Sequence, residues 1–312
     1  PGGHEPKELV VIARTAKSVL NAYFPNAALW ICPQDWDEEQ YQAWLEILAA
    51  QGASGVRSWL DGIVYGPGMV VPLDEFAKSM APYSLPIRLY PDMTHSLSDQ
   101  LPIPNWDPAF QWTEGRETVN PRPLSEGRIA ARQKVHADAG MSSYNEGCHD
   151  DVNKHVWLAV FWGADDGDEQ TAAAVVVRSW LKDYARLHVS PRLASTVLDL
   201  IYGLESNWQG PVEHNPSINQ TYALAEGLLT DGGSLVPRMT PRDRLEWRLQ
   251  QLMYRAHYDK FVQQRVATER LGGRRALASI RQSLDDGHHS SSVAAAVAKA
   301  TLTLDEAAQK SR

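Results

Sequence analysis

The sequence predicts an α/β fold built of β/α units in the first half of the chain, followed by an all-α helical domain. In residues 1–169, short apolar runs closed by Gly or Pro alternate with helical patterns, which is typical of a parallel sheet. In residues 170–271, helical patterns follow one another with Gly or Pro between them. Residues 272–312 are rich in Ala, Ser and charge, so we expect a loosely ordered or helical tail there.

The β/α region opens with an expected helix over residues 6–23, where apolar residues recur at helical spacing. Strands are predicted at residues 28–33, 62–66, 86–91 and 140–145. Each run is short and apolar and is followed by a helical pattern, so we expect parallel strands whose carboxyl ends share one face. Asp37 and Gln40 have the spacing of a capping box, which places the start of the helix after the first strand.

Composition excludes several classes of function. The net charge is −8 and the basic residues are dispersed, so we expect no nucleic acid partner and no anionic membrane surface. No apolar run approaches the roughly 20 residues that a membrane span requires. Cys32 and Cys148, the two cysteines, fit no metal spacing and are expected to be free thiols. His149 and His155 are too irregularly placed to hold a metal, so we expect neither a metal nor another cofactor.

Polar residues stand at the carboxyl ends of the predicted strands. Tyr65 closes the second strand, Asp92 and His95 follow the third, and Asn145 and Glu146 follow the fourth. In parallel α/β folds the strand bodies are buried, so polar groups are displayed only at the carboxyl ends, where catalytic loops form. The sequence therefore predicts a site on this side of the sheet.

Asp92 and His95 are the first candidates for chemistry. A carboxylate at a strand end can act as a nucleophile, as a base or as an acceptor for a substrate hydroxyl, and a nearby imidazole can tune it. The alternative is structural, because an Asp that follows a proline often begins a turn. The sequence leaves both interpretations open.

Glu146, Asp150 and Asp151 raise the same question in the stretch SSYNEGCHDDVNKHVW. Acidic residues are favoured at the positive end of a helix, and this alone accounts for Asp150 or Asp151 at the start of the following helix. Glu146 precedes that helix and is predicted to project from the strand tip, where a general acid would stand.

A long connection between the third and fourth strands carries aromatic, acidic and basic residues. Trp106, Asp107 and Arg122 are predicted to bind substrate there, because aromatic rings stack on the C–H faces of sugars while polar groups bond to hydroxyls. The alternative is a Trp-rich segment that packs against the fold. We favour packing for Trp112 and the binding site for Trp106 and Asp107.

The run LYPDMTHS…PIPNWDPAF…EGRETVNPRP…SYNEGCHDDVNKHVW resembles bacterial proteins of the glycoside hydrolase barrel superfamily, relatives of β-hexosaminidases and α-glucuronidases. The likeness is clearest over residues 86–157. It implies a catalytic (β/α)₈ barrel followed by a helical domain, although no assigned catalytic motif transfers residue by residue. Since only about four barrel strands are countable, we expect TIM-barrel-like units that form the carboxyl-terminal half of a barrel, with edges that must be covered.

These observations lead to a predicted glycoside hydrolase whose partner is a carbohydrate. Glu146 is assigned as general acid and Asp92 as the partner carboxylate, with Asp150 or Asp151 as its substitute. Carboxyl groups about 5 Å apart would retain the anomeric configuration, and groups about 6.5–9.5 Å apart would invert it. The alternatives are a non-catalytic carbohydrate-binding or scaffold protein derived from a truncated barrel, and a helical interaction module in residues 170–271. Sugar, linkage, compartment and oligomeric state are not predicted.

Overall fold

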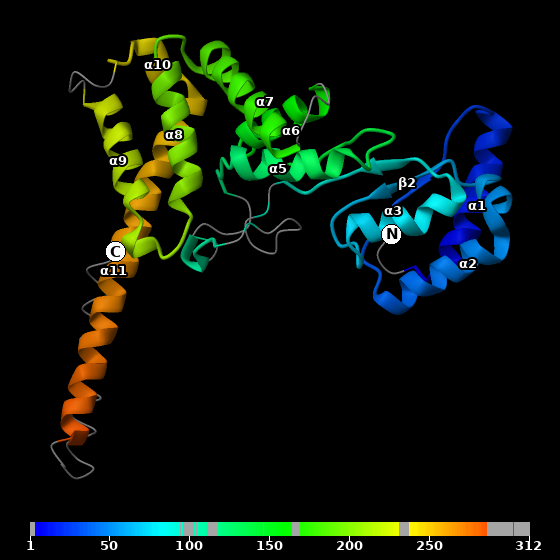
Figure 1. Cartoon of the computed structure of the whole chain (residues 1–312), viewed down its shortest axis with the longest axis horizontal. Helices are drawn as coiled ribbons and strands as arrows, with labels where there is room; N and C mark the ends of the chain where they lie inside the picture. The colour runs from blue at the N-terminus through cyan, green and yellow to red at the C-terminus, as the bar shows by residue number, and fades with distance from the viewer. Residues whose placement is uncertain are drawn as a thin grey trace. The chain divides into compact units, whose positions relative to one another are not determined.

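A computed structural model describes most of the chain as two compact units (Figure 1). Described are residues 4–93, 95, 103, 105–110, 118–145, 147–163, 169–230, 237–285 and 302. Unit 1 comprises Pro1–Pro102 and Pro123–Leu181, and unit 2 comprises Ile103–Arg122 and Lys182–Arg312. The described residues are 66% helical.

Unit 1 contains a small parallel sheet and most of the helices of the first half of the chain. Its strands are β1 (Trp30–Ile31), β2 (Gly62–Tyr65) and β3 (Ile87–Leu89). Its helices are α1 (Pro6–Tyr23), α2 (Glu38–Arg57), α3 (Leu73–Met80), the 3₁₀ turn η1 (Ala81–Tyr83), α5 (Pro123–Lys134), α6 (Asp151–Trp162) and the larger part of α7 (Glu169–Tyr184).

The sheet has the order β1-β2-β3, and both pairs are parallel (Figure 1). In this register Ile63 stands beside Ile31 on one neighbour and beside Ile87 on the other. These three side chains are buried on the side of the sheet that faces the helices. The three strands lie within the runs that the sequence predicts, and their parallel pairing is confirmed.

A further segment continues the sheet beyond β3 without forming a regular strand. Parallel bridges join Leu89 to Met141 and Asp92 to Tyr144. Backbone bonds of 2.9 Å from Ser142 N to Leu89 O and from Tyr144 N to Pro91 O keep one register throughout. Pro91 has no N–H to donate, so the ladder is interrupted between the two bridges. Residues 139–145 therefore run beside β3 but pair only at isolated points.

A hydrophobic core cluster of unit 1 lies between the sheet and helices α1, α2 and α3. Trp44 of α2 is fully buried and lies between Trp36 and Trp59, with ring centroids 5.5 and 6.2 Å away. Helix α2 begins at the capping box of Asp37 and Gln40 that the sequence predicts. Burial of these large rings against the sheet stabilises unit 1 and leaves the strand ends in fixed positions.

The predicted fold class is wrong. The protein is mostly helical with one three-stranded sheet, and no barrel-like half is evident in the part of the chain that the structure describes. The strands have two to four residues each. Between β3 and the segment that runs beside it, Ile103–Arg122 belongs to unit 2 and α5 follows, so this connection is not a plain β/α unit. A run of strand-like segments with helices after them predicts parallel pairing, but it does not predict closure or curvature.

Unit 2 is helical in every element that the structure describes after α7. It contains η2 (Ala185–Val189), α8 (Ala194–Asn207), η3 (Val212–His214), α9 (Pro216–Leu229), α10 (Pro241–Leu245) and α11 (Trp247–Asp285). Helices α8, α9 and α11 pack on one another (Figure 1). A Cβ on Gly203 of α8 would lie 2.2 Å from Thr221 Cγ2 of α9, so glycine is needed for this close approach. The structure thus shows the helical content of this half, while the domain bounds 170–271 stay a prediction.

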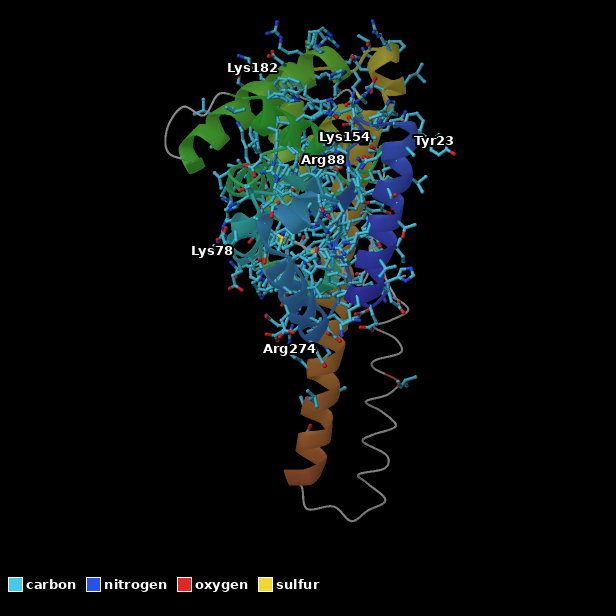
Figure 2. The ribbon with its side chains drawn as sticks, turned by 90° about the vertical axis from the view of Figure 1, so that its right-hand side faces the viewer. Tyr23, Lys78, Arg88, Lys154, Lys182 and Arg274 are labelled. Atoms are coloured by element: carbon cyan, nitrogen blue, oxygen red, sulfur yellow. The ribbon has the colours of Figure 1, made fainter. Side chains whose placement is uncertain are left out.

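An aromatic side chain of unit 1 is largely exposed. Tyr23, near the end of α1, is 76% exposed and its side chain projects away from the helix into solvent (Figure 2). None of the described helices combines the length and the apolar character that crossing a bilayer requires.

Candidate functional site

The sheet of unit 1 has two different faces, because successive side chains of a strand point to opposite sides. The inner face, which carries Ile63 and Leu89, packs on the helices. The outer face carries Trp30 and Arg88 on its amino side: a Cβ on Gly62 would lie 2.3 Å from the Trp30 ring, and the Arg88 guanidinium lies 4.7 Å from that ring's centroid. Side chains on this outer face at the carboxyl ends of the strands form the candidate site.

Asp92 and His95 form a buried pair at the end of the strand ladder. They are 3% and 5% exposed, and His95 Nδ1 contacts Asp92 Oδ2. The backbone N–H of His95 also donates to Asp92 Oδ1 over 3.4 Å. The spacing of three residues lets the chain turn back after the strand and bring the ring to the carboxylate. An imidazole held through Nδ1 has a fixed orientation, which is the arrangement of an acid–base group.

Tyr144 lies beside this pair. It is bridged to Asp92 through the backbone, and its ring centroid is 5.4 Å from that of His95. The chain then reaches Asn145, whose Oδ1 accepts a 3.1 Å bond from the N–H of Gly147. Glu146, the predicted general acid, lies outside the described residues.

Tyr65 does not meet Asp92. It lies on the inner face, 8% exposed, with its ring 5.3 Å from Phe76 of α3. Its hydroxyl donates to Val71 O over 3.1 Å. Burial raises the pKa of Tyr65 to about 12, with a smaller effect from Tyr41. The predicted role of Tyr65 in substrate binding stays a prediction, whereas its observed contacts belong to the core.

Asp150 and Asp151 stand at the start of α6. Asp150 is fully buried at the N-cap position and makes no side-chain capping bond. Asp151 Oδ1 lies 3.1 Å from Lys154 Nζ, and the same ammonium donates to Gly147 O over 3.1 Å. The Asp151 carbonyl and His155 Nδ1 are 2.6 Å apart. These contacts agree with an acidic first turn for α6, the alternative interpretation of Asp151.

The other predicted substrate-binding residues lie in unit 2. Asp107 Oδ2 accepts from Val212 N over 2.8 Å, and Asp107 Oδ1 accepts from Ala109 N over 2.9 Å. The Trp106 and Trp208 rings meet edge to face with centroids 4.6 Å apart. Hence the observed contacts of Trp106 and Asp107 anchor the segment Ile103–Arg122 within unit 2.

Arg122 belongs to the same segment. It is fully buried, and its guanidinium lies 5.1 Å from the Trp106 ring centroid. The structure therefore distributes the predicted site residues over two units. It brings Asp92 and His95 together, and it places Trp106, Asp107 and Arg122 with one another in the other unit.

Sequence reasoning missed a buried polar cluster in unit 2. Arg255 and Asp259 are both fully buried, and Arg255 Nε donates to Asp259 Oδ1 over 2.6 Å. Asn207 Nδ2 donates to Asp259 Oδ2 over 2.8 Å, and Arg255 Nη1 contacts Val119 O. The guanidinium also lies 4.1 Å from the Trp208 ring centroid. The signal was a charged pair four residues apart within the apolar stripe of a helix.

Tyr90 was missed as well. It lies two residues before Asp92 and on the same face of the sheet, so strand alternation alone would have selected it. No group of His, Cys, Asp and Glu among the described residues could hold a metal ion.

A surface cavity of about 390 Å³ lies elsewhere in unit 1. It is lined at the amino end of β3 by Pro86 and Ile87 and also by His136 and Asp138. His136 Nε2 lies 2.8 Å from Asp74 Oδ1 of α3. Since the strands are parallel, this cavity is at the opposite end of the sheet from Asp92.

Comparisons of the chain with models of protein families, with curated proteins and with solved structures found no match.

Proposed function

We propose that this protein binds a glycan at the carboxyl end of the unit 1 sheet and hydrolyses a glycosidic bond there. Asp92 is the partner carboxylate, His95 orients it, and Glu146 is the general acid. The observation that supports this proposal best is the buried contact between Asp92 and His95 beside Tyr144, from which the chain continues to Glu146.

The chemistry requires two groups with different tasks. One acid delivers a proton to the leaving oxygen, while a carboxylate attacks the anomeric carbon or activates a water molecule. His95 limits the rotation of the Asp92 carboxylate through two contacts, one from the ring and one from the backbone N–H. A carboxylate oriented in this way is positioned for attack before substrate arrives.

The test is hydrolysis of a panel of aryl hexosaminides, glucosides and glucuronides by the wild type, Glu146→Gln and Asp92→Asn. Both substitutions keep the size of the side chain but remove its acid–base function, so each variant should lose at least about a hundredfold in kcat/KM. Glu39→Gln is the matched control, because Glu39 is exposed on α2. Thermal melts of all four proteins show whether the fold is kept.

The outcomes separate the proposal from its alternative. Wild-type activity in Glu146→Gln or in Asp92→Asn on a hydrolysed substrate removes that residue from the catalytic machinery. If the protein binds a glycan but hydrolyses no member of the panel, the result supports the alternative, a non-catalytic carbohydrate-binding protein.

A further inference from the structure

Tyr90 stands on the outer face of the sheet immediately before the Asp92–His95 pair. Its backbone N–H donates to Tyr65 O over 2.7 Å, which fixes it in the strand ladder. Tyr90 is half-buried, and no hydrogen bond of its hydroxyl to a described residue is observed. A half-buried tyrosine is suited to stacking on a ligand through its ring and to bonding it through its hydroxyl.

Gly66, which follows β2, lies next to this ring, and Cys32, which follows β1, lies next to Gly66. A Cβ on Gly66 would lie 3.0 Å from Tyr90 Cδ1 and 3.5 Å from Cys32 Sγ, so the three residues converge on one point. The absence of a side chain at Gly66 lets the ring lie close to the sheet. Burial raises the pKa of the Cys32 thiol to about 11, so this group is neutral at physiological pH.

The same face has aromatic groups on both sides of Asp92. Tyr144, half-buried, follows from the neighbouring segment and contacts the His95 ring. Arg88 lies earlier on the same face, but its guanidinium stacks on Trp30. The carboxyl end of the outer face thus combines a neutral floor, made by Gly66 and Cys32, with two tyrosines and one carboxylate.

We propose that Tyr90, packed over Gly66 and beside Cys32, forms a subsite that binds one neutral sugar ring of the glycan next to Asp92. This inference rests on the proposed function for the identity of the ligand. The C–H face of a pyranose stacks on the tyrosine ring, and the Tyr90 hydroxyl bonds to a sugar hydroxyl. Tyr90 is a specificity-determining residue, and Asp92 acts on the bond beside the ring that Tyr90 holds.

The test uses calorimetric binding of cellotetraose, chitotetraose and maltotetraose to the full chain, with kcat and KM measured on any hydrolysed substrate. Tyr90→Leu should weaken binding of the recognised saccharide by about tenfold and raise KM without lowering kcat, because the stacking contact is lost. Tyr90→Phe should lose less. Tyr23→Leu is the matched control, since Tyr23 is exposed on α1 (Figure 2).

Two further measurements keep the inference testable if Tyr90→Leu does not fold. Gly66→Ala introduces a Cβ 3.0 Å from the Tyr90 ring, so it should displace the ring and weaken binding while Tyr90 itself is unchanged. In the wild type, bound saccharide should slow the alkylation of Cys32 by iodoacetamide. Mass spectrometry measures the rate of this alkylation.

Unchanged affinity in Tyr90→Leu overturns the subsite, even if Asp92→Asn has abolished hydrolysis and the proposed function stands. If the wild type binds a saccharide but hydrolyses nothing, and Tyr90→Leu binds that saccharide more weakly, the subsite is supported and the hydrolase is contradicted. Failure of the wild type to bind every saccharide of the panel also overturns the subsite.

Discussion

Two buried polar pairs, one in each unit, have different surroundings. In unit 2, Arg255 and Asp259 are fully buried, and Asn207 supplies a further donor to the carboxylate. In unit 1, Asp92 and His95 are also buried, but they stand at the end of a strand ladder where regular pairing stops.

The difference lies in what is adjacent to each pair. The unit 2 pair is enclosed by helix packing and by the Trp208 ring, so its contacts serve the fold. The unit 1 pair is adjacent to Tyr90 and Tyr144, which are only half-buried. Burial of a charge alone therefore does not identify a functional site; accessible groups beside it do.

The largest expected effect is on the unit 2 pair. Arg255→Met removes the cation from a fully buried carboxylate, so the free energy of unfolding should fall by about 3–5 kcal/mol. Urea unfolding followed by circular dichroism measures this change. A loss below about 1 kcal/mol would show that the pair is dispensable for unit 2.

Asp107→Asn tests whether the segment Ile103–Arg122 is anchored by the contacts described. The carboxylate accepts hydrogen bonds from both Val212 N and Ala109 N, whereas an amide has only one acceptor oxygen. The free energy of unfolding should therefore fall by about 1–3 kcal/mol. Saccharide binding and hydrolysis should stay at wild-type values when corrected for the folded fraction. Loss of binding without loss of stability would instead support the substrate-binding role predicted from the sequence.

A partly exposed pair in unit 1 should give a smaller, pH-dependent effect. Asp61 Oδ2 accepts from Lys17 Nζ and from Leu29 N, each over 2.7 Å. Burial alone raises the pKa of Asp61, but these two bonds outweigh it and hold the pKa below its ordinary value of 3.8.

Because the folded-state pKa of Asp61 is depressed, its stabilising contribution is present above pH 3.8 and is lost as pH falls through the folded-state value. Asp61→Asn should therefore cost about 1 kcal/mol at pH 7 and nothing at a pH below the folded-state pKa. Unfolding curves at several pH values measure the difference. An equal loss at all pH values would contradict the assignment.

The smallest effect is expected for an exposed pair on the same helix as Arg255. Arg265 Nε lies 2.8 Å from Glu269 Oε1, and the two side chains are 46% and 44% exposed. Arg265→Gln should change the free energy of unfolding by no more than about 0.5 kcal/mol. Compared with Arg255→Met under identical conditions, it isolates the contribution of burial. A loss as large as that of Arg255→Met would refute the comparison.

The sequence predicted local features well. The three short apolar runs pair in parallel as β1, β2 and β3, and Asp37 caps α2, because alternation and capping are decided by neighbouring residues. The contact between Asp92 and His95 is local in the same sense, since the two residues are three positions apart.

Distant contacts were not predictable from the residues alone. Nothing local indicates that Trp106 and Asp107 pack in unit 2, because their partners follow about a hundred residues later. Pro91 gave a local signal against a complete fourth ladder, yet the apolar runs favoured a half barrel. Tyr90 was predictable by alternation from Asp92, once the side of the sheet that carries the site was known.

The central claim is tested most directly by the activity per folded molecule of Asp92→Asn and Asp107→Asn, measured side by side on a substrate of the wild type. Each variant replaces one buried carboxylate by an amide, one in each unit. The account predicts kcat/KM at least about a hundredfold below wild type for Asp92→Asn and unchanged for Asp107→Asn. Equal activity of the two variants would contradict it.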